Sequence, residues 1–102
     1  LIEQTFINLI LNAMDAVKDN PNPRIALIGE EQQQRIVVKV TDNGSGIPDE
    51  LLDKIFVPFF STKKTGNGIG LSLCKQVMIL HKGSINVNSQ PGVGTVFTMT
   101  FS

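Results

Sequence analysis

The order of helix-like and strand-like hydrophobic patterns along these 102 residues is the feature that most restricts the fold. Apolar residues recur at helical spacing over residues 1–19 and 69–81, and a shorter helix is expected over 49–55. Runs rich in Ile and Val, separated by turn residues, predict four strands, at 24–29, 35–41, 84–89 and 94–101. This order is not a βαβ alternation. It favours an α+β fold in which helices cover one face of a mixed, mostly antiparallel sheet.

The connections between these elements are of two kinds. Residues 30–34 form a polar connector of hairpin length, and Gly83 is expected near the C-cap of the second long helix. Residues 56–68 mix apolar and polar side chains without a sustained period, which predicts a mobile loop. Because the chain opens inside a helical pattern, we expect residues 1–102 to be one N-terminally truncated domain.

Composition excludes several classes of function. The net charge is zero, whereas a nucleic-acid-binding domain usually carries a basic excess. The apolar stretches are far shorter than the roughly 20 residues that a membrane span needs, so no membrane contact is expected of this domain. A single cysteine, Cys74, rules out an internal disulfide and suits a cytoplasmic compartment. A membrane anchor of a parent protein would lie outside this chain.

The opening helix carries a polar stripe. Its members, spaced four, four and three residues apart, share one face of an otherwise apolar helix: Gln4, Asn8, Asn12 and Asp15. Amides in apolar surroundings cost free energy unless each is hydrogen-bonded, which favours a ligand as their partner. The alternative is that they satisfy neighbouring backbone groups.

A glycine-bearing loop follows the second predicted strand. Asp42 would stand at the end of that strand, where its carboxylate can accept a hydrogen bond from an exocyclic amine such as N6 of adenine. Guanine carries an acceptor at that place and would be rejected. Gly44 and Gly46 permit positive φ and a close backbone approach. The alternative is an ordinary turn, since Asp-Asn-Gly is common turn chemistry.

A second glycine-rich segment, Gly66–Leu71, leads into the last helix. Free backbone N–H groups and the positive end of a helix dipole suit phosphate oxygens. The segment is neither a Walker A loop nor a dinucleotide-binding motif, because it lacks the Gly-Lys-Ser/Thr ending and the G-x-G-x-x-G spacing.

Between the glycine segments lies Phe56–Lys64. Its phenylalanines can pin the base of a lid whose lysine reaches a phosphate. Position favours Lys63 over Lys64, but the sequence does not decide between them. The alternative is a core-anchored loop with a solvated basic end. His81, the only histidine, stands at a helix end, where such residues are most often structural.

Taken together, these segments resemble the ATP-binding catalytic domain of two-component sensor histidine kinases. Asn8–Ala16 is similar to the N box, Asp42–Gly46 to the G1 box, Phe56–Phe60 to the F box and Gly66–Leu71 to the G2 box. Gly94–Thr95 resembles the family's final Gly-Thr pair. The boxes occur in the family's order, and the resemblance runs from Gln4 to the end of the chain.

The resemblance implies a Bergerat-type two-layer α/β sandwich whose N-terminal strand is absent from this chain. It also implies ATP and Mg²⁺ as ligands, with Asn12 as a magnesium ligand, Asn8 near the phosphates and Asp42 on the adenine amine. Asn8 and Asn12 would be the catalytic residues. The implied nucleotide site further includes Gly44, Gly46, Ile47, Thr62, Lys63, Gly66, Gly68, Ile69, Gly70, Leu71 and Thr95.

Two positions refine the implied activity. Hydrolytic relatives such as gyrases and mismatch-repair ATPases typically place a glutamate where Asn8 stands, and a neutral amide cannot act as that base. Asn8 therefore favours phosphoryl transfer to a protein histidine over hydrolysis. Many family members carry a basic residue at the position of Asp15, so countercharge must come from magnesium and the lid lysines, and modest affinity is expected.

The implied partners are a dimerisation domain of the same parent protein, which bears the phosphoacceptor histidine, and a response regulator; nucleic acid is not among them. Two alternatives remain open. As alternatives to the kinase domain, the chain would be a hydrolytic ATPase module of the same superfamily or a degenerate domain that only binds partners.

Overall fold

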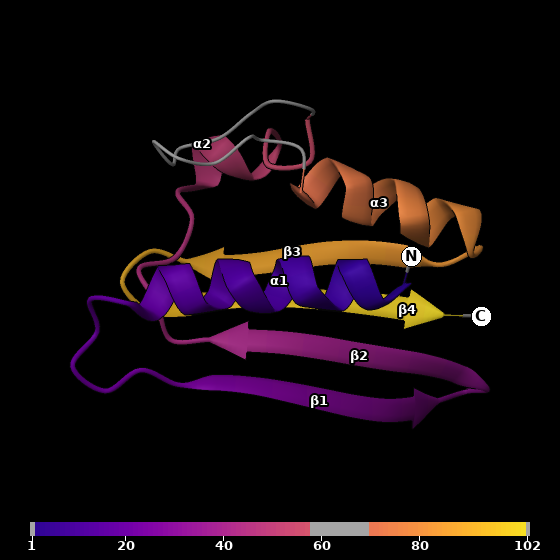
Figure 1. The fold of residues 1–102 in the computed structure, drawn as a ribbon, viewed down its shortest axis with the longest axis horizontal. Coiled ribbons are helices and arrows are strands. Elements are labelled where there is room, and N and C mark those ends of the chain that lie inside the picture. The colour runs from indigo at the N-terminus through magenta and orange to yellow at the C-terminus, as the bar shows by residue number, and fades with distance from the viewer. Residues whose placement is uncertain (1, 58–69, 102) are drawn as a thin grey trace.

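The computed structural model describes residues 2–57 and 70–101 (Figure 1). It contains, in chain order, α1 (Ile2–Val17), β1 (Ile25–Gln32), β2 (Arg35–Asp42), α2 (Asp49–Leu52), α3 (Gly70–Leu80), β3 (Ser84–Gln90) and β4 (Gly94–Phe101). The predicted α+β class is confirmed. No described helix combines the length and the apolar character needed to cross a bilayer.

The described strands form one sheet in the order β1-β2-β4-β3, and every neighbouring pair is antiparallel. The register aligns Asp42 of β2 with Thr95 of β4, and Thr95 with Ser89 of β3. Since residues aligned across strands share a face of the sheet, these three side chains form a polar row at one end of it.

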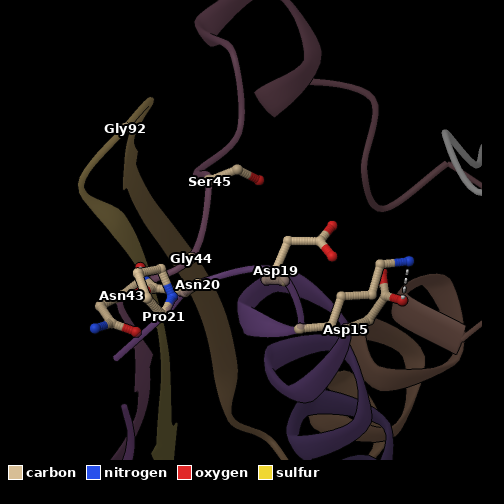
Figure 2. Close-up of a pocket in the computed structure, with 10 residues that line it drawn as sticks. Asp15, Asp19, Asn20, Pro21, Asn43, Gly44, Ser45 and Gly92 are labelled. Atoms are coloured by element: carbon tan, nitrogen blue, oxygen red, sulfur yellow. Dashed lines mark hydrogen bonds and ion pairs between the residues drawn. The ribbon is translucent and has the colours of Figure 1, made fainter. Parts of the chain in front are cut away.

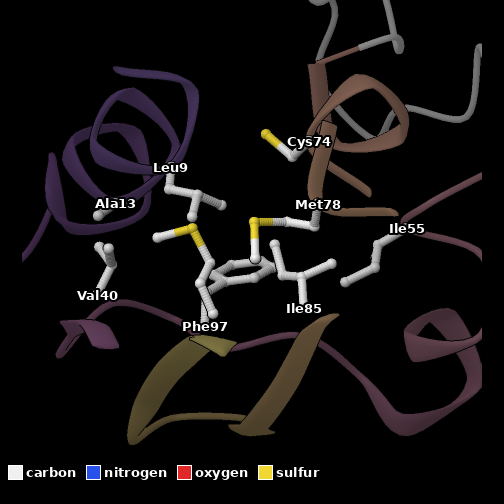
Figure 3. Packing of buried hydrophobic residues seen from close by; sticks show 9 residues of the cluster. Leu9, Ala13, Val40, Ile55, Cys74, Met78, Ile85 and Phe97 are labelled. Carbon is white, nitrogen blue, oxygen red and sulfur yellow. The ribbon is translucent and has the colours of Figure 1, made fainter. Parts of the chain in front are cut away.

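The core lies between one face of this sheet and both long helices (Figure 3). Leu9 of α1, Met78 of α3 and Met99 of β4 are completely buried. The buried residues of α1 recur every four positions: Thr5, Leu9, Ala13 and Val17. Because this stripe faces the core, it fixes the rotation of α1 about its axis and therefore the direction in which the asparagines point.

Strand β1 differs from the other strands because all its residues are exposed. It runs to Gln32, three residues beyond the predicted end, and the turn contains only Gln33 and Gln34, with φ of 50° and 67°. Glu30 and Glu31 do not end the strand, because a strand exposed on both faces needs no apolar alternation.

All three described helices end earlier than predicted, and α1 ends at Val17 rather than near residue 19. After Leu52, the chain continues in four-residue turns, in which Lys54 N–H donates to the Leu51 carbonyl at 2.9 Å. Helix α3 ends at Leu80 in a Schellman motif, where Gly83 N–H donates to the Met78 carbonyl at 2.8 Å. The residue with left-handed backbone there is Lys82, with φ of 58°, rather than Gly83.

Candidate functional site

Asp42, the last residue of β2, has a carboxylate held by backbone groups. Gly44 N–H donates to Oδ1 at 2.8 Å, and a second backbone hydrogen bond comes from Thr95. Partial burial raises the pKa of Asp42 above its ordinary value, and the two hydrogen bonds offset part of that rise. The carboxylate therefore has a fixed orientation and retains acceptor capacity for a ligand.

The loop after Asp42 lies against the end of α1. A Cβ on Gly44 would stand 2.5 Å from the Ala16 carbonyl oxygen, so this position admits no side chain without displacing backbone. Gly46 has φ of 80°, a conformation that side chains disfavour. Positive φ and close approach were expected of these two glycines together; both have close backbone neighbours, and only Gly46 has a positive φ.

Asn43 holds this loop to the turn between α1 and β1. Its side chain accepts a hydrogen bond from Arg24 N–H at 2.8 Å and donates one to the Asn22 carbonyl at 2.8 Å. The Asn20 side chain donates to the Asn43 carbonyl at 2.7 Å. Sequence reasoning treated Asn43 as turn chemistry and missed this role. The proline-flanked asparagines at 20–22 are the signal that could have indicated it.

Ser89 is a second residue that sequence reasoning missed. Its hydroxyl accepts a hydrogen bond from Ile47 N–H at 2.7 Å and lies 3.0 Å from the Gly94 carbonyl oxygen. It also lies 2.8 Å from the Thr95 hydroxyl. Ser89 thus links the loop after β2 to the first two residues of β4, of which Thr95 is a predicted nucleotide-binding residue.

The predicted asparagine stripe borders the buried stripe of α1. Asn8 and Asn12 are half-buried, whereas Gln4 is exposed. The Asn8 side chain is close enough to buried Cys74 on α3 to lower the pKa of its thiol, so this face of α1 is directed at α3. Burial raises the pKa of the Cys74 thiol, although its contacts with Asn8 and Thr5 offset part of the rise.

The base of the predicted lid is packed into the core. The Phe56 ring meets Phe97 edge-on, with centroids 6.4 Å apart, and the Lys75 ammonium lies 5.5 Å from the Phe56 centroid. Ile47 and Leu71 pack against the core cluster, and α3 begins at Gly70. The other predicted residues of this region lie outside the described residues: Thr62, Lys63, Lys64, Gly66, Gly68 and Ile69.

A polar pocket of about 490 Å³ lies where the end of α1 meets the loop after β2 (Figure 2). Asp15 and Asp19 stand on its helical side, and the Lys18 ammonium lies 3.4 Å from the Asp15 carboxylate. Among the predicted nucleotide-binding residues that the structure describes, Gly44 alone lines it. This pocket is therefore beside the predicted site, and Lys18 partly neutralises the acidic residue at position 15.

The described residues contain no group of three or more His, Cys, Asp or Glu side chains able to hold a metal ion. A half-buried amide such as Asn12 nevertheless fits Mg²⁺ that arrives with a nucleotide, because that ion takes most of its ligands from phosphates and water. Asp42, with its remaining acceptor capacity, fits the amine of adenine.

Comparison with known proteins identifies the family of the chain. The sequence model of the "Histidine kinase-, DNA gyrase B-, and HSP90-like ATPase" family matches residues 1–102. Sporulation kinase D of Bacillus subtilis (strain 168) is 35% identical over 99 residues, which cover 97% of this chain and 19% of that protein. The signal transduction histidine-protein kinase AtoS of Escherichia coli (strain K12) is 38% identical over 99 residues, covering 97% and 16%.

Solved structures give the same result. The catalytic domain of histidine kinase ThkA matches with a TM-score of 0.84 and 38% identity, over 98% of this chain and 64% of that one. The chain spans less than a fifth of the length of the two curated relatives. The chain belongs to the histidine kinase-, DNA gyrase B- and HSP90-like ATPase family and is homologous to the catalytic domain of sensor histidine kinases.

Proposed function

We propose that this chain binds Mg–ATP between α1, the loop after β2 and the start of α3, and donates the γ-phosphoryl group to a histidine. That histidine would belong to a separate dimerisation domain of the same parent protein, and a response regulator would receive the phosphoryl group in turn. The observation that carries the proposal is the oriented Asp42 carboxylate at the end of the sheet.

Asp42 supports recognition of adenine. One of its oxygens accepts from Gly44 N–H, so the carboxylate cannot turn away from its position. The N6 amine of adenine is a donor and matches the remaining acceptor capacity, whereas O6 of guanine would face the carboxylate as a second acceptor. A site with buried acceptors discriminates strongly against a ligand that leaves them unpaired.

The phosphates would lie toward α3. Helix α3 begins at Gly70, and its first-turn N–H groups have no partner within the helix, which suits anionic oxygens. Asn8 lies on α1, and its contact with Cys74 shows that its side chain faces α3. Asn12, one turn further along α1, would contribute its amide oxygen to Mg²⁺. Bound magnesium would neutralise charge on the phosphates.

Asn8 also supports transfer over hydrolysis. Activating a water molecule requires a group that can take its proton, and a neutral amide cannot do so. An amide can still donate or accept hydrogen bonds that orient the phosphates. We therefore expect the domain to act on a positioned acceptor histidine. Such a domain works where ATP and response regulators are found, which is the cytoplasm.

Calorimetric titration of the chain with ATP tests binding. We expect a magnesium-dependent Kd for the wild-type chain, and we expect Asn12→Ala to abolish the magnesium dependence. Asn86→Ala, at an exposed position of β3, is the matched control and should bind like wild type. A well-folded wild-type chain that binds neither ATP nor ADP would contradict the proposal and favour a domain that only binds partners.

A second experiment separates transfer from hydrolysis. The chain is incubated with radiolabelled ATP, with and without a separately supplied dimerisation domain that bears a phosphoacceptor histidine. We expect acid-labile label on the dimerisation domain and little free phosphate without it. Steady phosphate release by the chain alone would instead favour the hydrolytic module.

A further inference from the structure

The Ser89 hydroxyl has three hydrogen-bonding neighbours, and it can bond to all three at once in only one arrangement of protons. A serine hydroxyl has one proton to donate and two lone pairs that accept. Its three neighbours are Ile47 N, the Gly94 carbonyl oxygen and Thr95 Oγ1, at 2.7, 3.0 and 2.8 Å. The first can only donate a proton and the second can only accept one.

These chemical constraints determine the direction of the remaining hydrogen bond. Because Ile47 N–H donates to Ser89 and Ser89 donates to the Gly94 carbonyl, all three bonds coexist only if Thr95 donates its proton to Ser89. Thr95 is 4% exposed, so a different orientation would leave a buried hydrogen bond unmade. The Thr95 oxygen then keeps lone pairs and has no proton to offer a ligand.

The direction of the Thr95 proton affects the proposed base site because Thr95 is the cross-strand neighbour of Asp42. Thr95 is paired with Asp42, and its backbone already hydrogen-bonds to that carboxylate. With the Thr95 proton directed to Ser89, the carboxylate and the hydroxyl oxygen next to it are both acceptors. In direct contact, such a pair matches a donor edge of a base and offers nothing to a carbonyl such as O6 of guanine.

We propose that Ser89 is a positioning residue that sets base specificity: it takes the Thr95 proton and so makes the Thr95 hydroxyl an acceptor beside Asp42. This inference rests on the proposed function, because it concerns the base of the same nucleotide. Ser89 itself does not have to touch the nucleotide. Its bond to Ile47 N–H also holds the loop after β2 against β3.

The test is the ratio of ATP affinity to GTP affinity, measured by calorimetry on the chain with Mg²⁺. We expect Ser89→Ala to lower this ratio by about fivefold, the equivalent of one neutral hydrogen bond. Ser89→Thr keeps the hydroxyl and should restore the ratio. Ser84→Ala, an exposed serine on the same strand, is the matched control and should leave the ratio unchanged. A purely structural role of Ser89 would weaken binding of both nucleotides alike.

A double-mutant cycle checks that Ser89 acts through Thr95. Thr95→Val removes the hydroxyl but preserves the shape, so it should lower the ratio by itself, and adding Ser89→Ala should lower it no further. An unchanged ratio in folded Ser89→Ala, or an equal drop in the Thr95→Val background, would overturn the inference. If the wild-type chain binds no ATP, the proposed function fails and takes the inference with it.

Discussion

The ionised carboxylate of Asp42 lowers the stability of the unliganded protein. Its partial burial disfavours the ionised form, and this raises its pKa above the ordinary value of 3.8. Backbone hydrogen bonds from Gly44 and Thr95 reduce that cost without cancelling it. A ligand amine would offset more of the cost, so the stability of the free protein and the affinity for the ligand depend on the same carboxylate in opposite ways.

Asp42→Asn should therefore stabilise the free protein while it weakens ATP binding. A raised pKa means that the folded state binds more protons than the unfolded state between pH 3.8 and the folded pKa. The penalty is thus fully present above the folded pKa and fades as the pH falls toward 3.8. Urea denaturation at pH 7 should show Asp42→Asn as the more stable protein, with a smaller difference near pH 4.

The same substitution should reduce ATP affinity by roughly 10- to 100-fold, the worth of a hydrogen bond to a charged group. The asparagine oxygen is needed by Gly44 N–H, which leaves the amide NH₂ facing the adenine amine. Calorimetry measures the loss. Undiminished affinity in Asp42→Asn would show that the base binds elsewhere.

Asn43→Ala should lower the free energy of unfolding by about 1–3 kcal/mol, because two side-chain hydrogen bonds to the preceding turn are lost. Asn88→Ala, at an exposed position of β3, is the control and should stay within about 0.5 kcal/mol of wild type. Urea midpoints at constant m-value measure both. Equal stability of the two variants would mean that the Asn43 bonds are exchanged for water at no cost.

The candidate site was predictable where its chemistry is local. Asp42 and its glycines could be identified because a carboxylate at a strand end followed by Gly44 and Gly46 is a local pattern. Asn43 and Ser89 could not, because their roles depend on pairings across 21 and 42 residues, which no local pattern records.

At the scale of the elements, α1 illustrates how a single stripe anchors a whole helix. Its buried residues recur every four positions, and Leu9 at their centre is completely buried, whereas Leu11 on the same helix is 55% exposed. The two leucines share chemistry and helix propensity and differ in burial alone.

Leu9→Ala should therefore cost about 2–5 kcal/mol of stability, while Leu11→Ala should cost less than about 0.5 kcal/mol. Chemical denaturation of both variants, with Leu11→Ala as the matched control, tests the difference. Similar losses at the two positions would contradict the packing of α1 on the sheet.

The end of α3 offers a stabilising change. Lys82 has φ of 58° in the Schellman motif, a conformation that costs side-chain-bearing residues about 1–2 kcal/mol. Lys82→Gly should raise the free energy of unfolding by about 1 kcal/mol, since the greater freedom of glycine in the unfolded chain offsets part of the gain. Lys82→Ala retains the Cβ and should show no such gain. Thermal denaturation of the three proteins measures the effect.

The elements themselves were predicted in type and order, and the differences lie at their ends. Residues 30–32 were assigned to a connector because they are polar, but an exposed strand accepts such residues. Gly83 was expected near the C-cap of α3 and does lie there, but the left-handed residue is Lys82, one position earlier, which the sequence did not indicate. Both differences depend on how the element packs in the folded chain, which the intrinsic preferences of single residues do not predict.

For the molecule as a whole, buried contacts are distributed unevenly across the sheet. The core cluster draws on β2, β4 and β3, together with α1, α3 and Ile55, and it includes no residue of β1. Strand β1 is held chiefly by its ladder to β2, from Ile25↔Asp42 to Gln32↔Arg35. Few buried apolar contacts mean a low free energy of local opening.

Native-state hydrogen exchange should therefore show faster exchange for the amides of β1 than for those of β4, even though both strands have eight residues. The amides of β4 should require nearly global unfolding, because Phe97 and Met99 lie in the core. Mass spectrometry of peptides from the two strands measures the difference. Equal protection of both strands would contradict this distribution.

The exposure of β1 also has a consequence for ligand affinity. The start of β1 adjoins Arg24, whose backbone N–H donates to the Asn43 side chain and so helps to order the loop that carries Gly44. When β1 opens, that loop would lose this tether, and we expect such molecules not to bind nucleotide at the proposed site. The apparent Kd equals the intrinsic Kd divided by the competent fraction. At the proposed site, the opening of β1 would therefore weaken the measured affinity without any change in the contacts to the nucleotide.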